Sequence, residues 1–116
     1  MIPQKQPMQN VDDYQDKIKQ FVIYPRESAY SYLALGLSSE AGEVAGVIKK
    51  IIRDSDGSFS DESRLSLLKE LGDVVWYIAS LASEIGVDMS EILAENYHKL
   101  ELRAQRGVLG GSGDNR

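Results

Sequence analysis

The feature that most restricts the fold of this chain is a pair of acidic motifs at helical spacing. The motifs are Glu40-Ala41-Gly42-Glu43 and Glu70-Leu71-Gly72-Asp73. Each places two carboxylates three positions apart, and residues three apart share one face of an α-helix. Apolar residues recur at helical spacing around both motifs, over residues 33–51 and 67–81. The pattern predicts two amphipathic helices, each with an acid pair at the edge of its apolar face.

The four acids, Glu40, Glu43, Glu70 and Asp73, are candidate ligands for a metal ion. Carboxylates beside apolar surface repel one another and lose hydration unless a cation compensates them. Oxygen ligands of this kind suit Mg²⁺ or Mn²⁺ better than Zn²⁺. The alternative is that each motif forms surface ion pairs beside a core stripe. The repetition of the motif, with a matching glycine on consecutive helices, favours the metal site.

The length and net charge of the chain limit its number of domains and the kinds of ligand it can bind. A chain of 116 residues supports one domain with one core. Its formal net charge of −5 argues against binding a nucleic-acid polymer, although bound divalent cations would still allow a small anionic substrate. The sequence has no cysteine, no apolar run near the ~20 residues of a membrane span, and no signal-peptide core in its first residues, MIPQKQP. We expect a cytoplasmic protein.

Start and stop signals predict an all-α bundle of about four helices. Asn10, Ser60 and the Asp88–Glu91 capping box mark helix starts, and Pro25 and Gly86 mark stops. The predicted helices cover residues 10–22, 28–53, 60–85 and 88–105. We expect one helical domain over residues 10–106, preceded by a flexible arm (1–9) and followed by a glycine-rich tail (107–116).

Four glycines lie inside the predicted helices, where each costs about 1 kcal/mol relative to alanine. A close helix–helix crossing explains Gly36 and Gly46. Gly42 and Gly72 each stand just before an acid. We interpret these two as leaving room for a metal, its waters or a phosphate.

The last helix carries a polar stripe of Asn96, Lys99 and Arg103, spaced three and four apart. One interpretation is a solvated face with cations near the helix C-terminus, where the helix dipole favours them. Beside a metal site, the same groups would clamp a polyphosphate. For the tail, a disordered terminus is the simpler expectation. The alternative is that its glycine-rich backbone wraps phosphates and Arg116 adds a positive charge.

Other chemistries find little support. Glu95 and His98 form one Glu-x-x-His pair, but a ferritin-like di-iron bundle needs two, and His98 is the only histidine. No Walker or Rossmann glycine motif follows a strand. Water activated by a metal is therefore the expected attacking group. The aromatic residues near the acids, Tyr30, Tyr32, Trp76 and Tyr77, are interpreted as core or interface, with covering of a nucleobase as the alternative.

With both motifs in place, the chain resembles the MazG-like, all-α nucleoside triphosphate pyrophosphohydrolases. The resemblance covers Tyr24 to Arg116 and includes the segments Leu35–Val44 and Lys69–Tyr77. Asn96-x-x-Lys99-Leu100-x-x-Arg103 matches the family's substrate-phosphate segment. The tail is similar to that of small members, which are often encoded by phages or bacteria.

The resemblance implies Mg²⁺-dependent hydrolysis of a nucleoside or deoxynucleoside triphosphate to the monophosphate and pyrophosphate. Glu40, Glu43, Glu70 and Asp73 would hold the metal, and Asn96, Lys99, Arg103 and Arg116 would bind the substrate. Relatives form dimers or tetramers, so a homo-oligomer is expected to complete the bundle, in a bacterial or phage-infected cell. Many relatives have a further Glu where this chain has Ser39, which leaves the number of metals open.

Two alternatives stay open. One is a catalytically silent helical bundle that serves as a dimerisation or regulatory module. The other is a related pyrophosphohydrolase for a specialised nucleotide such as dUTP or phosphoribosyl-ATP.

Overall fold

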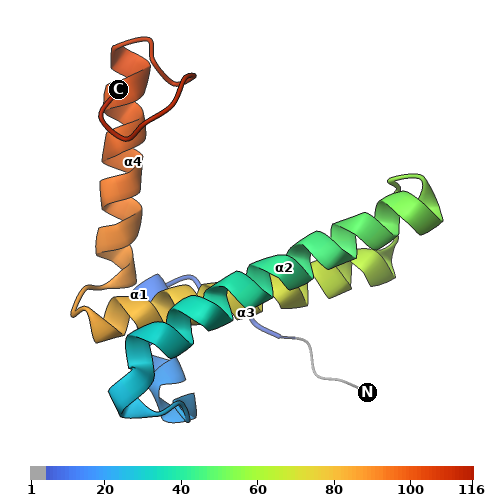
Figure 1. Cartoon of the computed structure of the whole chain (residues 1–116), viewed down its shortest axis with the longest axis horizontal. Helices are drawn as coiled ribbons and strands as arrows, with labels where there is room; N and C mark the ends of the chain where they lie inside the picture. Colours follow the sequence, from blue (N-terminus) through green and yellow to red (C-terminus); the bar gives the residue numbers. More distant parts are fainter. Residues whose placement is uncertain (1–4) are drawn as a thin grey trace.

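The protein is described by a computed structural model over residues 5–116. Its four α-helices and two short 3-10 helices run in the order α1 (Val11–Lys17), η1 (Ile18–Phe21), η2 (Arg26–Ser28), α2 (Ala29–Ser55), α3 (Asp61–Glu84) and α4 (Met89–Gln105). This part of the chain contains no strand. The prediction of an all-α protein with about four helices is confirmed (Figure 1). The predicted N-terminal arm lies in part outside the described residues.

Local side-chain caps fix where the helices begin. Asn10 Oδ1 accepts hydrogen bonds from two backbone N–H groups of α1, both at 3.0 Å. Ser60 Oγ accepts from the Ser63 N–H at 3.0 Å, and Ser63 Oγ accepts in return from the Ser60 N–H at 2.8 Å. The Glu91 carboxylate accepts from the Asp88 N–H at 2.6 Å. Each cap satisfies backbone donors that a helix start leaves unpaired, so the predicted starts hold.

The predicted first helix over residues 10–22 is wrong in its second half. The α-helix ends at Lys17, and the chain continues as η1 and then as extended backbone to Pro25. The Gln20 side-chain amide donates to the Lys17 carbonyl at 3.0 Å, where a longer α-helix would use a backbone N–H. Pro25 then disfavours helix in the residue before it. We call residues 18–28, which connect α1 to α2, the strap.

The second predicted helix extends further than expected. α2 continues to Ser55 instead of ending at Arg53, and it stops at two residues in the left-handed region, Asp56 (φ 51°) and Gly57 (φ 80°). The Gly57 N–H donates to the Ile51 carbonyl at 3.2 Å, as in a typical C-terminal cap.

α2 and α3 form a long antiparallel pair, and the strap and α1 lie against one end of it (Figure 1). One buried cluster joins the strap to α2 and α3 through Tyr24, Ala29 and the fully buried Leu33. A second cluster joins Ile18 to the C-terminal half of α3 and the start of α4. These two clusters anchor the strap beside the acidic motifs.

The described residues of a single chain do not form a closed four-helix bundle, and the predicted completion of the bundle by oligomerisation stays a prediction. α4 stands away from the α2–α3 pair, and no contact joins these described residues of α4 to α2 (Figure 1). The radius of gyration is 17.2 Å, against about 13 Å for a compact domain of this length. None of the described helices has the length and hydropathy to cross a membrane.

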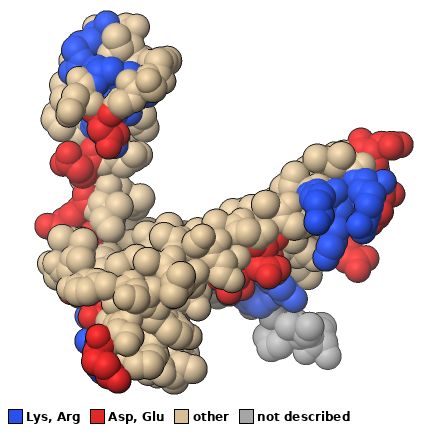
Figure 2. Space-filling view, in the orientation of Figure 1, with Lys and Arg blue, Asp and Glu red and all other residues tan. Residues whose placement is uncertain are grey.

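Apolar side chains that a closed bundle would bury are exposed instead. α3 exposes Leu65, Leu68, Leu71 and Val75, and α4 exposes Leu93, Tyr97 and Leu100. Much of the visible face of the molecule carries neither acid nor base (Figure 2). The separation of α4 therefore leaves two apolar stripes without a partner in the described chain.

Candidate active site

The antiparallel pairing of α2 with α3 brings three predicted metal ligands together. One carboxylate oxygen each from Glu40, Glu70 and Asp73 lies within 4.8 Å of the other two. Oxygens on opposite sides of a bound Mg²⁺ are about 4.2 Å apart, since each lies about 2.1 Å from the ion. The three side chains are therefore within reach of one divalent cation. We call them the acidic cluster.

The carboxylates of the acidic cluster form no ion pair with a described lysine or arginine. Among the described residues, none of the ion pairs joins Glu40, Glu43, Glu70 or Asp73 to a lysine or arginine. Burial raises the pKa of Glu40, and the negative charges of Asp73, Glu70 and Glu43 raise it further. Uncompensated carboxylates of this kind favour a bound cation over the alternative of surface ion pairs.

Glu43 is not part of the cluster of mutually close oxygens. It lies one turn further along α2 and lines an adjoining groove of about 410 Å³ between α2 and α3, together with Glu70. Its charge still acts on Glu40. The structure thus brings three of the four predicted ligands together and places the fourth beside them.

Of the four glycines inside the helices, only Gly36 lies against a neighbouring side chain of the described chain. A Cβ at Gly36 would collide with the ring of Tyr77 on α3, so this glycine makes room for a side chain of the neighbouring helix. A Cβ at Gly42, Gly46 or Gly72 would meet no described heavy atom within 4 Å. The role predicted for Gly42 and Gly72 stays a prediction, since the same open space is found at Gly46, which has no close crossing in the described part of this chain.

An aromatic cavity of about 330 Å³ adjoins the acidic cluster. Glu40 and Asp73 line one side of it. Rings and apolar side chains line the remainder: Phe21, Ile23, Tyr24, Tyr32, Trp76 and Tyr77. The Tyr24 and Tyr32 rings stack with centroids 5.6 Å apart, and Trp76 meets Tyr77 edge to face at 5.1 Å. The cavity therefore offers flat apolar surface directly beside the carboxylates.

The sequence pointed to only part of this cavity. Tyr32, Trp76 and Tyr77 were candidates for covering a nucleobase, and they do line the cavity. The strap residues Phe21 and Tyr24 were missed, because they fell in or beside a predicted helix and not in a site. Pro25 was the available signal, since it forces extended backbone just before α2.

The cationic stripe on α4 lies apart from the acidic cluster. The C-terminal half of α4 extends away from the α2–α3 pair, so Asn96, Lys99 and Arg103 do not join the acids within one chain (Figure 1). Lys99 Nζ and Arg103 Nη2 both lie 3.1 Å from Asp114 Oδ1. Arg103, only 5% exposed, also donates to the carbonyls of Gly113 and Asp114. The stripe thus holds the chain's own tail.

The tail is a compact loop, and the simpler expectation of a disordered terminus is wrong. The Arg116 guanidinium donates to four carbonyls, those of Val108, Leu109, Gly110 and Gly113, at 2.6–3.1 Å. Glycines at positive φ let the backbone turn around this side chain, among them Gly111 (φ 88°) and Gly113 (φ 89°). In this structure Arg116 therefore organises the loop from inside.

Comparison with known proteins agrees with this geometry. Residues 28–108 match the MazG nucleotide pyrophosphohydrolase domain. The matched range includes α2 and α3 with both acidic motifs and the cationic stripe of α4. The chain is also 45% identical over 113 residues to the Gene 37 protein of Mycobacterium phage L5, covering 92% of this chain and 99% of the phage protein. No solved structure matches the chain significantly.

Proposed function

The chain belongs to the MazG nucleotide pyrophosphohydrolase family, and we propose that it hydrolyses a nucleoside or deoxynucleoside triphosphate to the monophosphate and pyrophosphate. The observation that carries the proposal is that the acidic cluster and the aromatic cavity adjoin each other. Three uncompensated carboxylates lie within 4.8 Å of one another, and two of them also line an aromatic cavity large enough for part of a nucleoside. A metal and a nucleoside would therefore be neighbours.

In this proposal Glu40, Glu70 and Asp73 hold Mg²⁺ or Mn²⁺, and Glu43 completes the set from the next turn of α2. When bound, the cation lowers the pKa of a water molecule and stabilises the negative charge that develops on the phosphate. The side chains fix the position of the cation because two rigid, antiparallel helices carry them. Burial and then the negative charges of the neighbouring acids raise the pKa of Glu40, and a bound cation would relieve both effects.

The position of the cavity supports cleavage at the α-phosphorus. A nucleoside stacked on the rings would place its own α-phosphate nearest to Glu40 and Asp73, which line the same cavity. The β- and γ-phosphates would extend beyond the acids and leave together as pyrophosphate. The rings provide stacking surface for any base, so we propose no preference between bases.

We propose that Asn96, Lys99 and Arg103 bind the β- and γ-phosphates. Arg116 would contribute by holding the C-terminal loop that contacts Lys99 and Arg103. Since α4 extends away from the acids of its own chain, these cations would reach the site from a second copy. The exposed apolar stripes of α3 and α4 would be buried in such a homodimer or homotetramer. Similarity to a phage protein supports action in the cytoplasm of an infected bacterium.

The test is a panel of ribo- and deoxyribonucleoside triphosphates, with dUTP and phosphoribosyl-ATP included, incubated with the protein and Mg²⁺. We expect pyrophosphate release, and loss of turnover in Asp73→Asn with the fold retained by circular dichroism. Release of inorganic phosphate instead would contradict the proposed cleavage position. If no nucleotide is cleaved, the silent dimerisation or regulatory module becomes the better description.

A further inference from the structure

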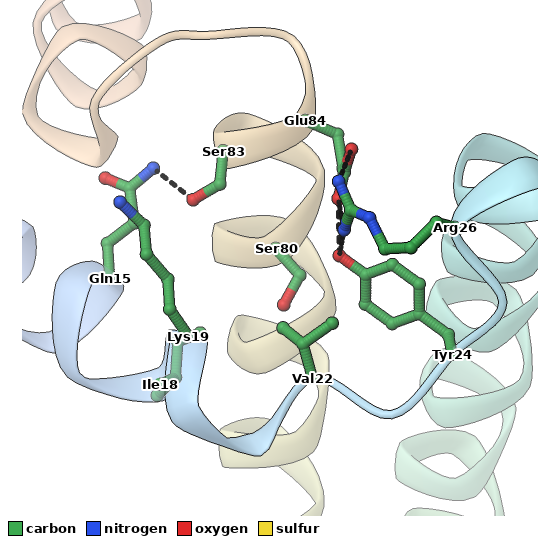
Figure 3. Close-up of a pocket in the computed structure, with 9 residues that line it drawn as sticks. All are labelled: Gln15, Ile18, Lys19, Val22, Tyr24, Arg26, Ser80, Ser83 and Glu84. Atoms are coloured by element: carbon green, nitrogen blue, oxygen red, sulfur yellow. Dashed lines mark hydrogen bonds and ion pairs between the residues drawn. The ribbon is translucent and has the colours of Figure 1, made fainter.

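Tyr24 forms part of two cavities at once. Its ring lines the aromatic cavity beside the acids, and the same residue lines a second cavity of about 340 Å³ between the strap and the C-terminal half of α3. Polar side chains, among them Gln15, Ser80 and Ser83, share the walls of the second cavity with apolar ones (Figure 3). The ring is buried, but it is not backed on every side by packed apolar atoms.

A carboxylate at the end of α3 holds Tyr24 in place. Tyr24 Oη donates to Glu84 Oε1 at 2.6 Å, and Arg26 donates to both oxygens of Glu84, at 2.5 and 3.2 Å (Figure 3). The side chain of Glu84 is only 13% exposed. Charge-assisted hydrogen bonds of this geometry are stronger than neutral ones. Both partners of Glu84 come from the strap, so one carboxylate fastens the strap to α3.

Near this ring, the backbone of the strap makes few hydrogen bonds among the described residues. The backbone bond from the Val22 N–H to the Lys19 carbonyl is long, at 3.4 Å, and the backbone is extended at Val22 and at Pro25. The Tyr24 ring packs in the buried cluster with Ala29 and Leu33, stacks on Tyr32 and meets Trp76 edge to face at 6.5 Å. Packing buries the ring, but cavities border it on two sides, so the hydrogen bond from its hydroxyl to Glu84 adds a directional constraint that apolar packing does not supply.

We infer that Glu84 is a positioning residue for nucleoside binding: by holding Tyr24 and Arg26, it keeps the strap side of the aromatic cavity in shape before the substrate arrives. The inference rests on the proposed function, which places the nucleoside in this cavity. Preorganisation of this kind improves affinity because the wall need not be ordered when the ligand binds. It would act on the nucleoside part of the substrate and leave the triphosphate contacts unchanged.

The test compares Tyr24→Phe with Tyr30→Phe. Both remove one hydroxyl that bonds to Glu84, but the Tyr30 hydroxyl donates to the main-chain carbonyl, at 3.2 Å, and Tyr30 does not line the aromatic cavity. We expect Tyr24→Phe to raise KM for a nucleoside triphosphate about fivefold, equivalent to about 1 kcal/mol, with kcat changed by less than about twofold. Tyr30→Phe should leave KM within about twofold of the wild type. Inhibition by inorganic tripolyphosphate, which has no nucleoside, should be the same in all three proteins.

Glu84→Gln provides the second variant, since it keeps an acceptor for Tyr24 but loses the charge that pairs with Arg26. Its KM should rise in the same direction, again without a change in tripolyphosphate inhibition. An unchanged KM in Tyr24→Phe overturns the inference. The inference is also overturned if tripolyphosphate inhibits the variant less strongly by the same factor by which KM rises, because this would indicate that the whole site has become less ordered.

Trp76, the only tryptophan, lies against Tyr24 and provides a readout that does not need turnover. If the wild-type protein cleaves no nucleotide, the proposed function fails. Titration of a non-hydrolysable nucleoside triphosphate against Trp76 fluorescence still tests the positioning role. Equal dissociation constants for wild type and Tyr24→Phe, or no binding to either, then overturn the inference.

Discussion

Lys99 Nζ lies 3.1 Å from Oδ1 of Asp114, a residue of the C-terminal loop. Arg103 donates to the same oxygen, so two cations converge on one carboxylate. Their hydrogen bonds hold the pKa of Asp114 below its usual range. The chain thus places its own anion on the side chains that we propose to bind the β- and γ-phosphates. A carboxylate oxygen held in this way occupies the position that a phosphate oxygen would need.

This contact predicts that Asp114→Asn binds inorganic tripolyphosphate more tightly than the wild type. The ligand would no longer have to displace a charged carboxylate, and because Asp114 is itself exposed to solvent, we expect a gain of only about a few-fold in affinity. Titration calorimetry measures the change. Asp13→Asn, which removes an exposed acid paired with Lys17 on α1, is the control and should leave the affinity unchanged. Weaker binding by Asp114→Asn would show that the carboxylate aligns the two cations instead.

Helix positions and the acidic cluster could be predicted because their causes are local. The caps at Asn10, Ser60 and Asp88 act within three residues, and each acid pair needs only helical geometry. Antiparallel pairing of the two helices then brings Glu40 to Glu70 and Asp73. Glu43 shows the limit of this reasoning, because the relative rotation of two packed helices decides which of two neighbouring acids faces the partner.

The strap and the tail loop could not be predicted from local pattern. The α1 helix stops where the Gln20 side-chain amide, instead of a backbone N–H, donates to the Lys17 carbonyl. Helix propensities do not predict such a competition between side chain and backbone. The tail folds around Arg116 and onto Arg103 through contacts up to eleven residues apart. The direction of α4 could not be predicted either, because the order of helices along the chain does not determine how a helix after a short turn packs against the preceding pair.

Divalent metal should stabilise the fold through the acidic cluster. The melting temperature of the wild type should rise with Mg²⁺ or Mn²⁺, since a ligand at 100 times its dissociation constant contributes about 2.7 kcal/mol. Glu70→Gln should lose this rise, because Glu70 supplies one of the three close oxygens. Glu43→Gln should lose part of it. Glu101→Gln on α4 controls for the change of net charge, and an unchanged rise in Glu70→Gln would remove that residue from the metal site.

Gly36→Ala should destabilise the protein although alanine favours helix. Its Cβ would collide with the Tyr77 ring and push one wall of the aromatic cavity aside, at a cost of about 1–3 kcal/mol. Gly46→Ala on the same helix meets open space in the described chain and should instead stabilise it by up to about 1 kcal/mol. Chemical denaturation of both variants measures the difference. Equal stabilities would show that Tyr77 can move without cost.

The Glu84 contact predicts a pH dependence of stability. Hydrogen bonds from Tyr24 and then Arg26 lower the pKa of Glu84 below its ordinary value of 4.5. A lowered pKa means that the contact stabilises the folded protein above pH 4.5 and that this stability is lost as pH falls through the folded-state pKa. Wild type should therefore melt higher than Glu84→Gln at pH 7, and the difference should shrink below pH 4.5. A difference that is constant with pH would mean that the charge of Glu84 is not involved.

Complementation between two defective variants would test whether a second copy completes the site. Asp73→Asn damages the acidic cluster, and Lys99→Ala damages the cationic stripe, which lies apart from that cluster within one chain. In a mixed oligomer, intact acids of one chain would meet an intact Lys99 of the other. Co-expressed chains, assayed at substrate concentrations well below KM, should then exceed the summed activity of the two parents.

The matched control for this experiment pairs Asp73→Asn with Glu70→Gln. Both substitutions damage the same acidic cluster, so exchange of subunits cannot rebuild an intact one, and no gain is expected. Light scattering should show an oligomer in every sample. If the first mixture gains nothing while remaining oligomeric, α4 would have to reach the acids of its own chain by moving as a unit about the turn at Gly86 (φ 76°).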